Sequence, residues 1–191
     1  MSRIGVEMPK PVLVIEDLMV SFDGFKAVSD LNFYLNKNEV HVVIGPNGAG
    51  KTTVLDLICG KTKATSGTIK FHDIELTKLK EFEIVRHGVG RKFQNPNIYE
   101  NLSVYENLEM SFPRGRNVFG ALFFRRTPDI EARIQEVASQ IFLTDLLHSS
   151  AGLLSHGQKQ WLEIGMLLMQ DPELLMLDEP VAGMSISERE Q

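Results

Sequence analysis

Cysteine is almost missing from this sequence of 191 residues. Cys59 is the only one, so no internal disulfide can form, and we expect a buried thiol in a reducing compartment. No stretch approaches the roughly 18 uninterrupted apolar residues of a membrane-spanning helix. The first residues, 1–11, are polar and lack the apolar core of a signal peptide. We therefore expect a cytosolic protein that reaches a membrane only by docking on a membrane protein.

An excess of basic charge is missing as well. The chain has 20 Lys and Arg against 25 Asp and Glu, a net charge of −5. Nucleic-acid-binding domains usually present a basic surface, so we expect no nucleic-acid partner. Repeats and low-complexity segments are also missing, and 43% hydrophobic with 24% charged residues is ordinary for a soluble globular protein. A chain of this length can bury one core and a small subdomain.

The most informative stretch that is present is a glycine-rich loop. It consists of Gly45, Pro46, Asn47, Gly48, Ala49, Gly50, Lys51, Thr52 and Thr53. These residues fit G-x-x-x-x-G-K-[S/T], the phosphate-binding loop of nucleoside-triphosphate hydrolases. Residues 40–44 before it predict a buried parallel strand, and residues 54–59 after it predict a helix.

A loop between a strand and a helix can wrap a phosphate with backbone N–H groups, and the helix N-terminus adds partial positive charge. We predict that Lys51 reaches the β- and γ-phosphates and that the Thr52 hydroxyl is a Mg²⁺ ligand. The alternative is a glycine-rich turn that binds nothing.

An antiparallel sheet is predicted before the loop. Residues 12–15 and 18–22 are strand-like and are separated by Glu16 and Asp17, while Asp23-Gly24 predicts a turn. Residues 31–35 alternate apolar and polar side chains, and residues 36–39 predict a second turn that leads into the phosphate-loop strand. The later predicted elements are strands at 68–71 and 89–93 and a short helix at 79–86.

Helical spacing of apolar residues follows Gln94, at residues 104–110 and 128–142. Between these helices, residues 111–127 combine prolines, glycines and arginines with a cluster of phenylalanines and aliphatic residues. Two interpretations of this insertion stay open: it packs on its own subdomain, or it presents a patch to a partner or to lipid.

A continuous apolar run at residues 174–177 predicts another buried parallel strand, and two carboxylates follow it directly. Asp178, at the end of the strand, can bind Mg²⁺ directly or through water. Glu179 is then placed to orient or deprotonate the attacking water. A solvated strand end is the alternative interpretation of this acidic pair.

A third motif supplies a resemblance to a known family. Leu154 is followed by Ser155, His156, Gly157 and Gln158. This L-S-H-G-Q resembles the signature motif of the ATP-binding-cassette (ABC) family, usually L-S-G-G-Q, and it precedes the acidic pair in the family's order. The resemblance implies that the motif opens a helix and grips the γ-phosphate of ATP bound to the opposite subunit of a head-to-tail dimer. His156 replaces the usual glycine, which is tolerable if the imidazole points to solvent.

Other positions agree with the resemblance. Gln94 matches the glutamine that contacts Mg²⁺ and water and senses the transporter. Phe22 stands where the family carries an aromatic that stacks on adenine, although a core side chain is an equal alternative. Residues 181–184 occupy the D-loop position.

The fold implied is α/β: a P-loop NTPase (RecA-like) core with an N-terminal antiparallel β-subdomain and a helical subdomain that carries the signature motif. Residues 1–191 would form a single nucleotide-binding domain. Residues 1–94 and 165–191 would form the catalytic core and β-subdomain, and residues 95–164 the helical subdomain. The family continues with a further helix, a strand and a histidine that contacts the γ-phosphate. No histidine follows Asp178 here, so we expect the domain to be incomplete at its C-terminus.

The implied function is ATP hydrolysis, with ATP and Mg²⁺ as cofactors, in an importer for a small polar solute. The partners would be a second ATPase subunit and membrane permease subunits, on the inner face of the cell membrane. Residues 91–96, the insertion and residues 154–169 resemble branched-chain amino acid and urea importers, the last segment most closely the urea type. A module that binds ATP and dimerises without hydrolysis is the alternative. A cassette ATPase of DNA repair or translation fits less well because the net charge is acidic.

Overall fold

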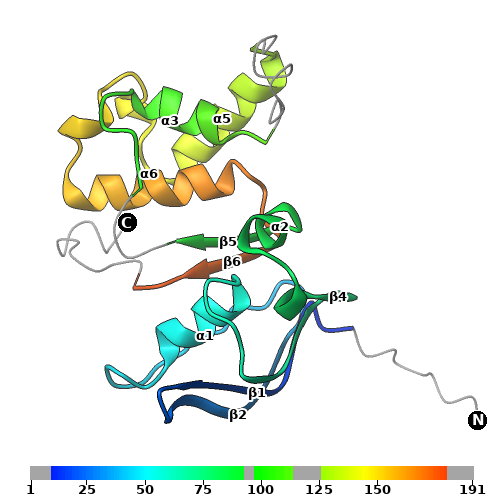
Figure 1. Ribbon diagram of the computed structural model, residues 1–191. Helices are drawn as coiled ribbons and strands as arrows, with labels where there is room; N and C mark the ends of the chain where they lie inside the picture. The colour runs from blue at the N-terminus through cyan, green and yellow to red at the C-terminus, as the bar shows by residue number, and fades with distance from the viewer. Residues whose placement is uncertain (1–9, 93–96, 114–125, 180–191) are drawn as a thin grey trace, which may run out of the picture. The chain divides into compact units, whose positions relative to one another are not determined.

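The computed structural model describes residues 10–92, 97–113 and 126–179 of the chain. The chain divides into two compact units, Met1–His87 and Gly88–Gln191, and each is described here by itself. The first unit contains strands β1 to β4 with helices α1 and α2, and the second contains β5 and β6 with helices α3, α5 and α6 (Figure 1). The predicted division into residues 1–94 with 165–191 and residues 95–164 stays a prediction.

An antiparallel sheet forms the first unit, as the sequence predicts. Its strands are β1 (Leu13–Phe22), β2 (Phe25–Leu35), β3 (Ser66–Phe71) and β4 (Ile74–Glu75), in the order β2-β1-β3-β4. Every neighbouring pair is antiparallel. Because side chains alternate along a strand, one face of the sheet carries the buried apolar residues, among them Leu13, Ile15, Ile69 and Phe71.

Residues 12–22, expected to form two strands, form one irregular strand instead. The register of β1 against β2 shifts between Ile15 and Leu18, where Asp17 has a φ of 48°. Such a shift is a β-bulge, which bends a strand without ending it. The turn predicted at Asp23-Gly24 is confirmed: the two residues have φ values of 47° and 89°, as a tight hairpin turn requires.

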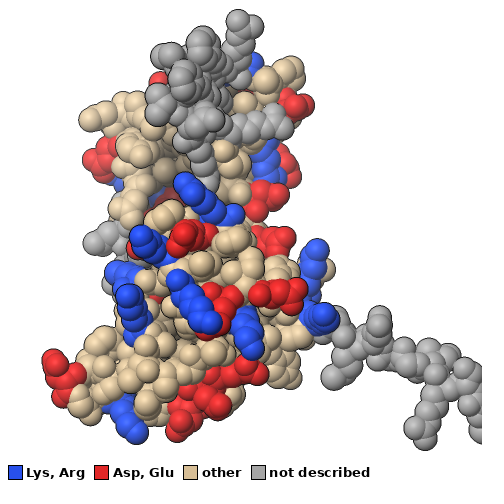
Figure 2. Space-filling view, turned by 45° about the vertical axis from the view of Figure 1, so that its right-hand side comes forward, with Lys and Arg blue, Asp and Glu red and all other residues tan. Residues whose placement is uncertain are grey.

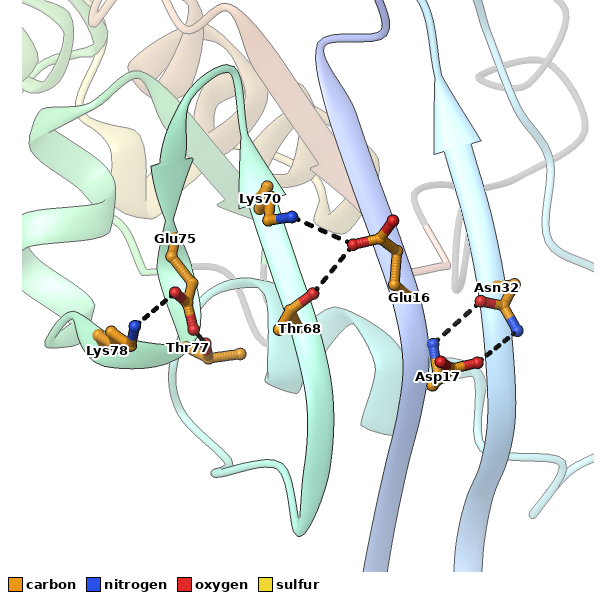
Figure 3. Close-up of polar contacts among 8 residues, drawn as sticks. All are labelled: Glu16, Asp17, Asn32, Thr68, Lys70, Glu75, Thr77 and Lys78. Carbon is orange, nitrogen blue, oxygen red and sulfur yellow. Dashed lines mark hydrogen bonds and ion pairs between the residues drawn. The ribbon is translucent and has the colours of Figure 1, made fainter.

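Polar contacts cross the solvent-facing side of this sheet (Figure 3). The Asn32 carboxamide on β2 accepts a bond from the Asp17 backbone N–H at 3.0 Å and donates to the Asp17 carboxylate at 3.3 Å, which ties down the bulge. On the other side of β1, Glu16 pairs with Lys70 of β3 at 3.1 Å. These contacts link all three long strands and pin their register.

The prediction of a strand at residues 40–44 is wrong. These residues are not in a strand, and Val40, Val42 and Ile44 are 90%, 79% and 86% exposed. A parallel strand needs a neighbour to supply its hydrogen bonds, and the first unit offers only a sheet in which all pairs are antiparallel. Residues 40–44 are therefore an irregular connection from the turn at residues 37–38 to the phosphate loop.

Short helices complete the first unit. They are α1 (Lys51–Ile58), the 3₁₀ turn η1 (Leu76–Lys78) and α2 (Glu81–Arg86). α1 packs on β2 and η1, and it buries Leu57 and Ile58. Cys59, directly after α1, is buried and forms no disulfide, as predicted.

The second unit contains a parallel strand pair, as predicted. Strands β5 (Val89–Lys92) and β6 (Leu174–Leu177) run side by side with Val89 opposite Leu174 and Lys92 opposite Leu177. Leu174 and Met176 are buried, whereas Leu177 is 38% exposed. Because the two strands are parallel, their last residues, Lys92 and Leu177, lie at the same edge.

The helices predicted in the second unit are confirmed. They are α3 (Val104–Ser111), α5 (Pro128–Gln140) and α6 (His156–Leu168), with 3₁₀ turns η2 (Thr144–Leu146) and η3 (Ala151–Leu153). These helices lie together in the second unit (Figure 1), and their core includes Leu108, Ile134, Val137 and Leu162. Most of the insertion lies outside the described residues. None of the described helices is long and apolar enough to cross a membrane.

Two glycines of the first sheet provide a matched stability test. Gly67 has a φ of 88°, and a Cβ there would lie 2.4 Å from the Asp17 carbonyl oxygen, whereas Gly24, with a φ of 89°, faces open space. We expect Gly24→Ala to cost about 1 kcal/mol through φ alone, and Gly67→Ala about 3 kcal/mol through φ and the clash. Urea denaturation of the two variants tests this, and equal losses would contradict the close approach of β3 to the bulge.

Candidate functional site

The phosphate loop joins residues 40–44 to α1, and its glycines have the conformations that the motif requires. Gly48 and Gly50 have φ values of 81° and 84°. A Cβ on Gly50 would also lie 2.6 Å from the backbone oxygen of Ala27 in β2. Gly50 is thus fixed both by its left-handed backbone and by close packing of the loop on the sheet.

Lys51 is the first residue of α1, and its side chain turns back over the loop. The ammonium donates to the carbonyl oxygens of Gly45 at 2.8 Å and Pro46 at 3.0 Å. The first N–H groups of a helix have no acceptor within it, so the start of α1 and the Lys51 ammonium together form a site for an anion. A phosphate is the anion that this geometry suits.

Thr52 is the Mg²⁺ ligand expected in the first unit, and within the part of the chain that the structure describes it does not belong to a cluster of metal-binding side chains. Thr52 is exposed in the first turn of α1. Among the described residues, no three His, Cys, Asp or Glu gather in a way that could hold a metal ion. Mg²⁺ is usually held by one or two protein ligands, with waters and substrate phosphates completing the shell. A lone threonine hydroxyl next to a phosphate site fits this pattern.

Asp178 and Glu179 follow β6 and have contrasting environments. Asp178 is only 6% exposed and lies 3.5 Å from the Arg91 guanidinium of the neighbouring strand, measured from Oδ2 to Nη2. Among the described residues its buried Oδ2 accepts no hydrogen bond, so this oxygen suits a cation. Glu179 is exposed and has a φ of 49°, which is uncommon for a residue with a side chain and clusters at functional sites.

Ser155 is the N-cap of α6, as the signature motif predicts. Its hydroxyl accepts from the Gln158 N–H at 3.1 Å, and the Gln158 side chain accepts from the Ser155 N–H at 2.9 Å, which completes a capping box. His156 is exposed, which is the condition under which a histidine can replace the usual glycine of the motif. Its Nε2 lies 3.3 Å from the Gln160 amide nitrogen. Gly157 is buried in the first turn.

Phe22 lies at the end of β1 beside the hairpin turn and is 48% exposed. The core interpretation of this side chain is therefore wrong, and stacking on adenine stays a prediction. Gln94 and residues 181–184 lie outside the described residues. Phe22 and the phosphate loop belong to the first unit, and Asp178, Glu179 and the signature residues belong to the second.

Comparison with known proteins identifies the family. The family model described as "ABC transporter" matches residues 28–182. The chain belongs to the ABC transporter family.

Among its relatives, the high-affinity branched-chain amino acid transport ATP-binding protein BraF of Pseudomonas aeruginosa is 37% identical, over 95% of this chain and 74% of that protein. The corresponding LivG of Escherichia coli K12 is 35% identical, over 96% and 75%. A probable LivG of Methanocaldococcus jannaschii is 34% identical, over 91% and 70%. The similarity to urea-type subunits is not confirmed by these relatives.

Solved structures confirm the fold class. The ADP conformation of MJ1267, an ATP-binding cassette of an ABC transporter, superposes with a TM-score of 0.78 at 31% identity, over 95% of this chain and 73% of that one. The cassette cbiO1 from Clostridium perfringens, part of the transporter complex cbiONQ, gives 0.77 at 28% identity, over 93% and 69%. The chain thus has the α/β P-loop NTPase fold of the ABC ATPases.

The ABC chain also contains a buried ion pair that the sequence analysis missed. Lys92, on β5, and Glu163, in α6, lie 3.4 Å apart between Nζ and Oε2, with side chains 1% and 7% exposed. Burial raises the pKa of the Glu163 carboxyl above its usual value, although Lys92 acts against this. Its sequence signal is a charged residue within an apolar stretch: Glu163 lies between Leu162 and Ile164, and Lys92 ends the buried strand β5.

Charges of both signs are mixed on one face of the ABC chain. Figure 2 shows Lys and Arg interspersed with Asp and Glu on the face in view. Among the described residues, several Lys and Arg are paired with Asp or Glu, for example Lys159 with Glu100 at 2.6 Å. This mixture agrees with the net charge of −5 and offers that face no attraction for a polyanion.

Proposed function

We propose that this chain is the ATP-hydrolysing subunit of an ABC importer for a small polar solute. The observation that carries the proposal is the phosphate loop, with Lys51 held over it by the Gly45 and Pro46 carbonyls and Gly50 locked against β2. ABC membership supports an ATPase, and the loop geometry supports a phosphate at this place.

Each site residue has a role that its chemistry suits. Backbone N–H groups of residues 45–53 would surround the phosphates, and Lys51 would pair with the β- and γ-oxygens. Thr52, Asp178 and Gln94 would hold Mg²⁺, which when bound neutralises charge on the phosphates. Glu179, exposed and ionisable, would orient the attacking water and accept its proton. Phe22 would stack on adenine.

A second copy, or a sister subunit, would complete the site. Ser155, His156, Gly157 and Gln158 begin α6, where the start of the helix suits a phosphate of the ATP bound by the other subunit. ATP would then close the dimer and hydrolysis would open it, and Gln94 would pass the change to the permease subunits. Through these permeases the chain would lie on the inner face of the cell membrane.

Branched-chain amino acids are the solute class that the relatives support. BraF and LivG carry this function in their names. Urea, which the sequence of residues 154–169 favoured, remains a second solute within the same proposal. Solute choice belongs to the binding protein and permease, so transport assays with those partners are needed to decide it.

The competing function is an ATP-binding module without hydrolysis. ATP titration with and without Mg²⁺, followed by steady-state phosphate release, separates the two functions. An ATPase binds ATP and releases phosphate in a reaction that needs Mg²⁺. Binding without phosphate release, in the presence of permease partners as well, would favour the binding module and contradict the proposal.

Ser155 offers a further test, because α3 has a matching cap. Ser103 and Glu106 form the same capping box as Ser155 and Gln158. We expect Ser155→Ala and Ser103→Ala each to cost about 1 kcal/mol of stability in urea denaturation. Only Ser155→Ala should also lower ATP turnover, by about tenfold or more, because it removes a phosphate contact across the dimer. Equal turnover in both variants would contradict the role of the signature motif.

A further inference from the structure

His156 is the residue of the signature motif that departs from the family's pattern, and its side chain contacts a buried partner. It is the first residue of α6, and its imidazole is exposed. The Nε2 atom lies 3.3 Å from the amide nitrogen of Gln160, four residues further along the same helix. Gln160 itself is only 1% exposed. An exposed imidazole is therefore attached to a side chain in the interior of the second unit.

The chemistry of the two nitrogens decides which tautomer this contact favours. The amide nitrogen of a glutamine can only donate, so the Nε2 atom of His156 accepts. A neutral imidazole carries one proton, and with Nε2 as the acceptor that proton is on Nδ1. Among the described residues, Nδ1 has no hydrogen-bond partner. The contact with Gln160 thus makes the other ring nitrogen an N–H donor that a ligand can use.

This donor belongs to the start of α6, where a phosphate is expected. The N–H of Gln158 donates to the Ser155 hydroxyl, whereas the N–H groups of His156 and Gly157 precede the first acceptor of the helix. Such N–H groups and the partial positive charge of the helix N-terminus favour an anion. The imidazole adds a side-chain donor to this end of the helix, which a glycine at position 156 could not do.

Stability is a weak reason for the buried amide of Gln160. Its Oε1 atom is buried as well and accepts no hydrogen bond from the described residues. A buried acceptor without a donor lowers stability, and an apolar side chain of similar volume would avoid that loss. What the amide supplies, and an apolar side chain does not, is a hydrogen bond that fixes the ring and the tautomer of His156.

We propose that His156 is a phosphate-binding residue, which donates from Nδ1–H to the ATP bound by the other subunit, and that Gln160 is its positioning residue. The proposal rests on the proposed function, because it takes the start of α6 as a phosphate site across the dimer. Gln160 acts through the imidazole and touches no phosphate.

Nitrogen NMR of the imidazole rings tests the attachment without any need for ATP. Free histidine favours the tautomer with the proton on Nε2, so we expect neutral His156 to be protonated mainly at Nδ1 in the parent and mainly at Nε2 in Gln160→Met. This variant replaces the amide with an apolar side chain of similar volume and is expected to fold. His148, exposed and stacked on Tyr105, should give the same signals in both proteins. A His156 ring protonated mainly at Nε2 in the parent would overturn the proposal.

ATP turnover, measured with the partner subunits that the chain requires, tests the phosphate contact. His156→Gly removes the donor and should lower kcat/KM for ATP about tenfold, as the loss of a hydrogen bond to a charged group does. His156→Asn keeps an N–H donor close to the position of Nδ1 and should recover most of the loss. His148→Gly, which removes an exposed imidazole outside α6, is the matched control and should stay within about twofold of the parent.

A double-mutant cycle separates orientation of the imidazole from packing of the helix. Gln160→Met should lower kcat/KM about three- to tenfold in the parent and have no further effect in a His156→Gly background, since Gln160 acts through His156. Losses that multiply would show that Gln160 only packs α6 and would overturn its role. Unchanged turnover in His156→Gly would overturn the phosphate contact while the proposed function stands. A parent chain that releases no phosphate would overturn the proposed function itself, and the role of His156 with it.

Discussion

Replacing Lys51 with alanine is expected to raise the Kd for ATP about a hundredfold or more, because two charge-assisted hydrogen bonds to phosphate are lost. The Lys51 ammonium lies within 3.0 Å of two loop carbonyls, so it is held over the loop that would surround a phosphate. Isothermal titration with ATP and Mg²⁺ measures the change.

Lys61→Ala is the matched control for this experiment. Lys61 follows α1 closely, and its pairing with Asp56 at 3.8 Å is a loose surface contact. Its removal takes away the same charge near the same helix but no phosphate contact, so the Kd should change less than about threefold. A Lys51→Ala variant that binds ATP as the parent does would show that the loop is not the nucleotide site.

Replacing Glu179 with glutamine is expected to lower kcat about 10²- to 10⁴-fold while ATP binding stays within a few-fold of the parent. The substitution keeps the size of the side chain and removes the carboxylate that accepts the proton of the attacking water. Glu179 is exposed beside the buried Asp178, so the change leaves the core and the Asp178–Arg91 pair in place. Phosphate release and ATP titration on the same sample measure the two effects.

Glu173→Gln controls for the loss of one negative charge near β6. Glu173 is exposed and directly precedes this strand, at the opposite end from Asp178 and Glu179. Turnover of the control should stay within about twofold of the parent, since a distant exposed charge is screened. If Glu179→Gln hydrolysed ATP as fast as Glu173→Gln, the catalytic base would have to be another residue.

Local sequence patterns predicted the elements whose signals are complete within a few residues. Asp23 and Gly24 are residue types that readily adopt the positive φ values of a tight hairpin turn, and the structure has the turn there. Ser155 with Gln158 is a capping box, and α6 begins at the next residue. In both cases the side chains that decide the structure are neighbours along the chain.

Structural features that depend on contacts between residues far apart in the sequence were predicted less well. Residues 40–44 have the composition of a buried strand, but a strand exists only where another strand supplies its hydrogen bonds. The bulge at Asp17 depends on Asn32, fifteen positions away, and on the close approach of Gly67. Neither contact is visible in the residues around Asp17.

The candidate site was also predicted where its motifs are contiguous and missed where its contacts join distant residues. The phosphate loop, the acidic pair and the signature motif were found from their spacing, because each is a contiguous motif. The buried pair of Lys92 with Glu163 was missed, since its members are 71 positions apart and only the packing of α6 on β5 brings them together. The sequence shows a charge among apolar residues, and the structure shows what that charge contacts.

A single-turnover reaction is the most direct test that this ABC chain is an ATPase in which Glu179 drives hydrolysis. The chain is mixed in excess with ATP and Mg²⁺, the reaction is quenched at intervals, and ADP is quantified for the parent and for Glu179→Gln. We predict that the parent converts its bound ATP to ADP, while the variant retains ATP bound and unhydrolysed. Bound ATP that stays intact on the parent, or equal rates in both proteins, would contradict the account.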